Sequence, residues 1–251
     1  MCSQCGFQIS VTAGTIFEGT RKPLRLWFRA IWYVTNQKNG VSALGLQRVL
    51  GLGSYKTAWT WLHKLRIAMV RPGRDRLCGE VEVDETYIGG KRSGKRGRGA
   101  DNKALVVIGI EFKDGRRGRV RLRYVPDASA DSLIGFIKES VSPGSLVSTD
   151  GWSGYKPLIS QGYKHNVLRP GDGVIGENLV PNVHLVASLL KRWLIGTHQG
   201  APQASHLDYY LDEFTFRFNR RTSRSRGMLF YRLLQQAVQV EPVTRRDIKG
   251  S

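Results

Sequence analysis

The stretch that decides the fold is Glu80-Val81-Glu82-Val83-Asp84-Glu85-Thr86-Tyr87-Ile88. Apolar and polar residues alternate along it, and side chains of successive residues in an extended chain face opposite sides. Val81 and Val83 would pack inward, so Asp84 shares the other face with Glu82 and Thr86. This pattern predicts a half-buried strand. A single carboxylate on such a face is commonly a solvated one, so Asp84 alone does not establish a function.

The residues after this strand continue an α/β pattern. Residues 104–112 form a β-branched apolar run, and Asp114-Gly115 is a hairpin-turn pair. Further strands are expected at 118–125, 145–150 and 163–168, with helices from 129 or 130 to 141 and within 182–239. We therefore predict an α/β domain over residues 78–240, with a mixed sheet flanked by helices. Residues 241–251 are expected to be a flexible tail.

The residues before the strand have helical spacing. Helices are expected at 24–33, from an N-cap at Ser42 to Leu50, and at 55–69, with a glycine-containing turn at 51–54. A helix, a short turn and a second helix with basic positions have the outline of a helix-turn-helix. A plain three-helix bundle has the same outline. We predict a helical DNA-binding region over residues 21–72.

Cys2 and Cys5 form a single C-x-x-C-G knuckle at the start of the chain. A zinc ribbon needs two knuckles for its four ligands, and Cys78 stands alone far downstream. Residues 1–20 are therefore interpreted as part of a zinc ribbon that binds Zn²⁺ only if an upstream cysteine pair is present. The alternative is that these cysteines bind nothing. Three cysteines are too few for a disulfide framework.

The charge is strongly one-sided. Lys and Arg total 39 against 20 acidic residues, a formal net charge of +19. Such an excess repels itself unless a polyanion is present, so nucleic acid is the first expected partner and an anionic membrane surface the second. The basic residues run along the whole chain, which favours nucleic acid. No long apolar run or signal-peptide pattern is present, so we expect a soluble, cytoplasmic protein associated with the nucleoid and no membrane.

Asp150 ends the expected strand Leu146-Val147-Ser148-Thr149 and is followed by Gly151-Trp152. A carboxylate at the C-terminal end of a buried strand lies where α/β sheets place ligand-binding groups. An Asx turn is the alternative. Two carboxylates from separate strands repel each other unless a cation lies between them. Asp84 and Asp150 therefore suggest a site for Mg²⁺ or Mn²⁺, two of which can carry out phosphodiester chemistry.

A third ligand would come from the helix that follows. His184 and Lys191 are seven residues apart, two turns of helix, and so project from one face. Imidazole binds Mn²⁺ and similar metals, although Mg²⁺ favours carboxylates. The alternative is an ordinary surface histidine.

Three segments resemble bacterial insertion-sequence transposases of the DDE type, which carry a zinc ribbon, a helix-turn-helix and an RNase H-like catalytic domain. They are residues 81–90, residues 148–155 and residues 206–221. The resemblance implies that Asp84, Asp150 and His184 bind two metal ions, with Lys191 nearby. Histidine then replaces the glutamate of the best-known pattern, and Glu177 is the alternative carboxylate. The resemblance also implies that the chain begins inside the zinc ribbon.

From this resemblance we expect metal-dependent cleavage at transposon ends and transfer of the 3′-OH into target DNA. Double-stranded DNA would be the partner, and two ends require at least a dimer. The alternatives are a decayed or non-enzymatic sequence-specific DNA-binding protein, and a nuclease without strand transfer. The basic residues expected to contact DNA are Lys56, Lys64, Arg66, Lys91, Arg92, Lys95, Arg96, Arg98, Arg217, Arg220 and Arg221.

Overall fold

The computed structural model describes residues 3–6, 10–71, 73–89, 103–169, 179–200 and 203–250. The chain divides into two compact units. A helical unit comprises Met1–Gly73 with Thr222–Ser251, and a sheet unit comprises Arg74–Arg221. None of the helices in the described ranges combines the length and apolar character needed to cross a bilayer.

The sheet unit contains a mixed sheet in the strand order β3-β2-β1-β4-β5. β1, β2 and β3 pair antiparallel, whereas β4 and β5 run parallel to β1. The strands are β1 (Glu80–Ile88), β2 (Ala104–Lys113), β3 (Arg116–Val125), β4 (Leu146–Thr149) and β5 (Lys164–Val167). The predicted α/β class, with a mixed RNase H-like sheet preceded by a helical region, is confirmed.

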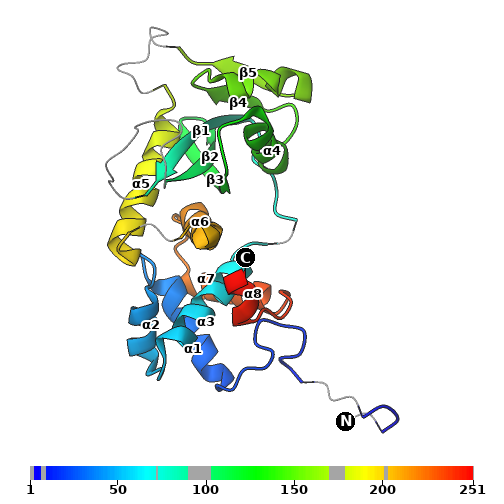
Figure 1. Ribbon diagram of the computed structural model, residues 1–251, viewed down its shortest axis with the longest axis vertical. Coiled ribbons are helices and arrows are strands. Elements are labelled where there is room, and N and C mark those ends of the chain that lie inside the picture. The colour runs from blue at the N-terminus through cyan, green and yellow to red at the C-terminus, as the bar shows by residue number, and fades with distance from the viewer. Residues whose placement is uncertain are drawn as a thin grey trace. The chain divides into compact units, whose positions relative to one another are not determined.

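Helices cover both faces of this sheet (Figure 1). They are α4 (Ala130–Ser140), the 3-10 helix η1 (Ser153–Gln161), α5 (Pro181–His198) and α6 (Ala204–Asn219). α4 and η1 pack on the face that carries Val81 and Val83. α5 and α6 pack on the opposite face, over Ile88 and the even-numbered residues of β2. The even-numbered side chains of β1 therefore point toward α5.

The outer edge of β3 is covered by polar side chains of α6. Asn219 accepts from the backbone N–H of Val120 at 2.7 Å and donates to its carbonyl at 3.1 Å. Asp208 accepts from the N–H of Tyr124 at 3.0 Å. An edge strand otherwise presents unpaired backbone groups. The polar residues of the segment 206–221 thus include side chains that complete the sheet.

The helical unit contains α1 (Leu24–Asn36), α2 (Ala43–Leu50), α3 (Tyr55–Ala68), α7 (Arg226–Ala237) and α8 (Arg245–Gly250). Its core includes Trp27 stacked on Trp61, with ring centroids 3.9 Å apart. α2 begins as predicted, because the Ser42 hydroxyl accepts from the N–H of Gly45 at 3.0 Å. Helix α2, a four-residue connection over residues 51–54 and α3 keep the helix-turn-helix outline.

The C-terminal third differs from the sequence-based boundaries. α7 packs on α1 and α3, so the sheet unit ends at Arg221 and not at residue 240. Residues 245–250 form α8, in which Ile248 is fully buried, whereas a flexible tail was expected. The helix η1 was not predicted, because Pro157 and two glycines in residues 151–161 mask its periodicity.

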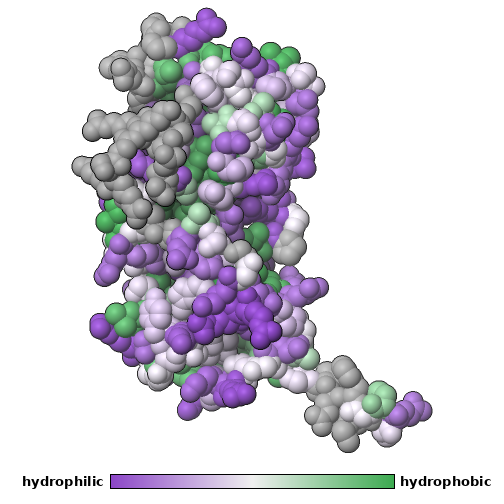
Figure 2. All heavy atoms as spheres, viewed as in Figure 1, coloured by the Kyte–Doolittle hydropathy of each residue, from purple (hydrophilic) through white to green (hydrophobic). Residues whose placement is uncertain are grey.

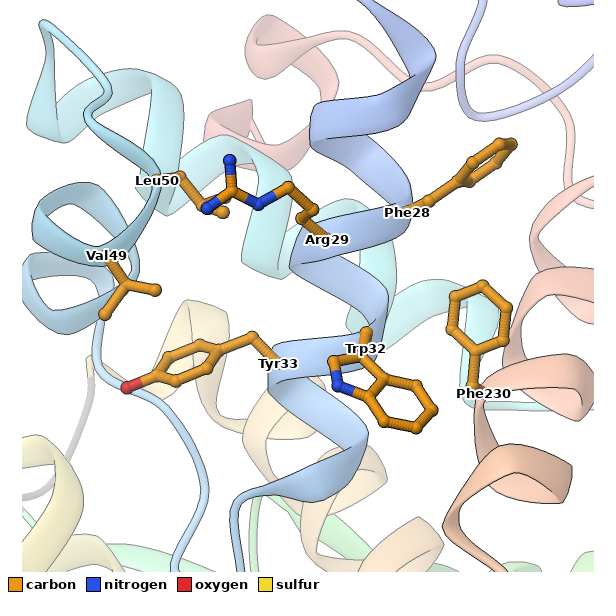
Figure 3. Close-up of a pocket in the computed structure, with 7 residues that line it drawn as sticks. All are labelled: Phe28, Arg29, Trp32, Tyr33, Val49, Leu50 and Phe230. Carbon is orange, nitrogen blue, oxygen red and sulfur yellow. The ribbon is translucent and has the colours of Figure 1, made fainter.

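α1, α2 and α7 also border an apolar pocket of about 440 Å³ on the helical unit (Figure 3). Trp32 of α1 lies against Phe230 of α7, with ring centroids 5.9 Å apart, yet stays 49% exposed. Arg29 brings one charge to this apolar lining. The pocket is therefore a surface feature of the unit and not part of its core.

Candidate active site

Asp84 lies in the middle of β1 on the face toward α5, and it is only 9% exposed. Its Oδ1 accepts a hydrogen bond from the backbone N–H of Glu85 at 2.8 Å. The alternation of β1 was predicted from the sequence, but the near-complete burial of this carboxylate was not. It arises because α5 covers this face of the strand.

Asp150 follows β4, which lies next to β1 in the sheet. The parallel register pairs Glu82 with Ser148. Continuing that register by two residues places Asp150 beside Asp84, on the same face. Oδ1 of Asp150 accepts from the N–H of Trp152 at 3.0 Å, so the Asx turn considered above is present. Gly151 has φ of 80°, which allows the chain to leave the strand at this point.

His184 lies in the first two turns of α5. Its Nε2 is 3.1 Å from Oδ2 of Asp84, although the two residues are 100 positions apart in the sequence. Ser188 donates to the His184 carbonyl at 2.9 Å, which marks the next turn of the same helix face. Lys191 lies at the surface one turn further along, and partial desolvation, with the nearby charge of Lys103, lowers its pKa. The structure therefore brings His184 to Asp84 and places Lys191 on the same helix.

Glu82 fixes the start of α5. One carboxylate oxygen accepts from the backbone N–H groups of Asn182 and Val183, at 2.9 and 3.2 Å. The other accepts from the Asn182 side-chain amide at 2.6 Å. Sequence reasoning placed Glu82 on the same face as Asp84 but gave it no role. Its partners are 100 residues away, which no local pattern reveals.

Glu85 points to the opposite face of β1, where it meets η1. The buried Tyr155 hydroxyl donates to Oε2 of Glu85 at 3.0 Å. Burial and the nearby carboxylates of Glu85, Asp84 and Asp150 raise the Tyr155 pKa. This tyrosine follows Asp150 by five residues, so its hydrogen bond ties the segment after β4 to β1.

Asp84 ionises less readily than a solvent-exposed aspartate, as its pKa shows. Burial, with further contributions from Glu85 and Asp150, raises the pKa of Asp84 from 3.8 to about 6. The Glu85 N–H and His184 act in the opposite direction. A cation placed among these groups would relieve the repulsion between the carboxylates.

The donor atoms suit Mg²⁺ or Mn²⁺, which bind carboxylate oxygens and, for Mn²⁺, imidazole nitrogen. In the described ranges, however, no three His, Cys, Asp or Glu side chains are gathered closely enough to hold a metal ion. Asp84 and His184 are in contact, whereas Asp150 does not complete a three-residue group. The donor atoms are of the types that these metals bind, but only two of the three expected ligands, Asp84 and His184, are in contact.

The basic residues of α3 have different environments. Lys56 is exposed on its first turn. Lys64 is half-buried and donates to the Ile16 carbonyl at 2.9 Å. Arg66 is 2% exposed, so the structure contradicts its expected contact with DNA. The helical pattern of α3 gave too little information to separate its outer face from its core face.

The arginines at the end of α6 also hold the fold together. Arg217 pairs with the fully buried Glu213 at 2.8 Å. Arg221 donates to the carbonyls of Gly118 and Arg117 on β3, and its guanidinium stacks 4.1 Å from the Phe218 ring centroid.

Arg220 donates to the Phe216 carbonyl at 3.3 Å and stacks on that ring at 4.0 Å. These contacts give Arg217, Arg220 and Arg221 structural roles, and their contact with DNA stays a prediction. Their guanidinium groups are engaged within the sheet unit.

Several sequence-based candidates lie outside the described residues. They are Cys2, Glu177, Lys91, Arg92, Lys95, Arg96 and Arg98. Cys5 is described and exposed, with a free thiol. On the face shown in Figure 2, hydrophilic side chains are spread over both units.

A mixed five-stranded sheet covered by helices on both faces, with the buried Asp84 on its central strand β1 and an accessory helical unit, defines an α/β protein. Residues 76–219 match the ISXO2-like transposase domain, and the chain belongs to this transposase family. It is also 28% identical over 236 residues, 86% of this chain and 77% of the relative, to an uncharacterized protein in transposable element ISH50 of Halobacterium salinarum. The insertion-sequence transposase resemblance is thereby confirmed.

Proposed function

We propose that the chain is a transposase that cleaves DNA at transposon ends in a metal-dependent reaction and joins the freed 3′-OH to target DNA. The observation that carries this proposal is the contact of His184 with the buried Asp84, beside the strand that ends in Asp150. Family membership gives transposition as the process.

Asp84, Asp150 and His184 would hold the metal ions, with Asp84 and Asp150 supplying carboxylate oxygens and His184 a neutral imidazole nitrogen. When bound, a pair of divalent cations supplies Lewis-acid activation of the attacking oxygen and charge stabilisation of the leaving one. The protein positions the DNA strand at this sheet position, so that attack and departure occur in line. Lys191 would contact a DNA phosphate, since it lies two helical turns beyond His184 on an exposed surface.

DNA would be held by charge. The net charge of +19 and the helix-turn-helix outline of α2 and α3 support a polyanionic duplex as partner. Lys56 is exposed at the start of α3, where helix-turn-helix proteins contact DNA. Lys56→Gln is expected to reduce the slope of log K against log[salt] by about 0.9. An unchanged slope in a filter-binding titration would remove Lys56 from the interface.

Transposition requires two ends to be brought together, so we propose at least a dimer on DNA. A zinc ion at Cys2 and Cys5 is proposed only for a chain that also has an upstream cysteine pair.

A second candidate function is end binding without cleavage. Two features favour it: the residue proposed as third ligand is a histidine and not a glutamate, and among the described residues no three possible ligands are gathered into one group. This candidate shares the DNA-binding surfaces with the first and differs in having no metal-dependent chemistry.

The test is a cleavage and strand-transfer assay on DNA that carries the element's own ends, with Mg²⁺ and then Mn²⁺. Asp150→Ala is compared with Asp131→Ala, which removes an exposed carboxylate from α4. We expect joined products from the wild type and from Asp131→Ala, and none from Asp150→Ala. Cleavage that persists in Asp150→Ala refutes the site assignment. Tight binding without cleavage by the wild type in either metal supports the second candidate.

A further inference from the structure

Glu82 lies on the same face of β1 as Asp84, but its carboxylate is bonded to the first turn of α5. It accepts three hydrogen bonds from the first turn of α5, at 2.6, 2.9 and 3.2 Å. The backbone N–H groups of a first helical turn have no partners within the helix. They also carry partial positive charge, which a carboxylate stabilises.

The start of α5 has no cap of its own. The residue at its N-cap position is Val180, which offers no side-chain acceptor, and Pro181 follows at the first helical turn. Helices usually receive a local Ser, Thr, Asp or Asn at this position. Here the acceptor comes from β1 instead, so the cap also fixes where the helix begins relative to the sheet.

The cap and the Asp84–His184 contact are consecutive connections between the same two elements. Glu82 and Asp84 are two residues apart on one face of β1, about 6.8 Å along the strand. Their partners Asn182 and His184 are two residues apart on α5. A shift or rotation of α5 that breaks the Glu82 bonds would also move the His184 imidazole away from Asp84.

We propose that Glu82 is a positioning residue that holds α5 on β1 and thereby sets the affinity of the Asp84–His184 site for a divalent cation. It acts through His184 and does not bind the metal. This inference rests on the proposed function, because it assumes a metal at Asp84. Residues that orient metal ligands without touching the metal affect affinity by about 10–100-fold.

The experiment measures Mn²⁺ binding to the full-length protein without DNA, by the electron paramagnetic resonance signal of free Mn²⁺. The variant is Glu82→Gln. Glu80→Gln is the matched control, because Glu80 is an exposed carboxylate two residues earlier on the same face of β1. We expect Glu82→Gln to weaken Mn²⁺ binding about 10–100-fold and Glu80→Gln to change it by no more than about twofold.

A double-mutant cycle with His184→Ala separates positioning from simple loss of charge. If Glu82 acts through His184, Glu82→Gln in the His184→Ala background weakens binding by no more than about twofold, within the usual error of additivity. If Glu82 binds the metal itself or acts only by its charge, the same fold-change occurs in both backgrounds. That outcome overturns the proposal.

Asp84→Asn distinguishes this inference from the proposed function. If the wild type does not bind Mn²⁺, or Asp84→Asn binds it equally well, the metal site fails and the role of Glu82 fails with it. If Asp84→Asn abolishes binding but Glu82→Gln behaves like Glu80→Gln, only the positioning role is overturned. If Glu82→Gln does not fold, as judged by circular dichroism, Asn182→Ala replaces it, because it removes the shortest of the three bonds from the helix side. An affinity unchanged in Asn182→Ala then overturns the proposal.

Discussion

Replacing Asp84 by asparagine is expected to make the metal-free protein more stable while removing its cleavage activity. Burial and neighbouring carboxylates raise the pKa of Asp84 from 3.8 to about 6. A group whose pKa is raised on folding contributes stability that is fully present below its unfolded pKa. That contribution is lost as the pH rises through the folded pKa. At neutral pH the ionised Asp84 therefore destabilises the fold.

The size of the effect follows from the shift. About two pKa units correspond to about 3 kcal/mol. Because neighbouring groups titrate together, we expect a gain of about 1–3 kcal/mol for Asp84→Asn at about pH 8. Asparagine retains an oxygen acceptor for the Glu85 N–H and can donate to a neutral His184 nitrogen. The gain should shrink below about pH 6 and vanish below about pH 4.

Urea unfolding in the presence of a chelator measures this difference, with hydrogen exchange of the β1 amides reporting the sheet unit separately. Glu80→Gln carries the same change of charge at an exposed position of the same strand and should show a much smaller gain. A variant that is less stable than the wild type at about pH 8, or equally stabilised at about pH 4 and pH 8, would refute the reasoning.

Two further substitutions test the roles of structural residues. Arg217→Met should destabilise the sheet unit by about 3 kcal/mol in urea unfolding, because it removes the ion pair of the buried Glu213. Lost DNA affinity with unchanged stability would instead restore the DNA-contact interpretation. Gly151→Ala should cost more than about 1 kcal/mol and abolish cleavage by displacing Asp150. The added methyl would lie 2.7 Å from a Val167 side-chain carbon, at a φ of 80°. Normal cleavage by this variant would show that the turn tolerates the shift.

The strands of the sheet could be predicted because each is indicated by residues that lie close together in the sequence. Alternation in β1, the apolar run of β2 and the Asp114-Gly115 turn each lie within a few residues. The turn has positive φ at both positions, 50° and 72°, as a two-residue hairpin requires. Strand-end position likewise singled out Asp150 as a candidate ligand.

What the sequence did not reveal depends on residues far apart in the chain. The Glu82 bonds to α5 and the Tyr155 bond to Glu85 span 100 and 70 positions. The burial of Arg66 and the ion pair of Arg217 with the buried Glu213 were missed for a related reason. A basic residue on a helix is predicted to be exposed unless the packing of that helix is known. The sequence around Glu213 likewise does not indicate that this residue is buried. The positions of candidate ligands were thus predictable, whereas the contacts that hold them were not.

The covered edge of β3 would limit the ways in which copies of this chain could associate on DNA. Molecules bound close together on a duplex have a high local concentration. An edge strand with unpaired backbone groups would then allow two molecules to pair strand to strand. Side chains of α6 already occupy the Val120 and Tyr124 backbone groups along this border. These three backbone groups are not available to extend the sheet, so association of copies at these positions would rely on side chains or on the DNA itself.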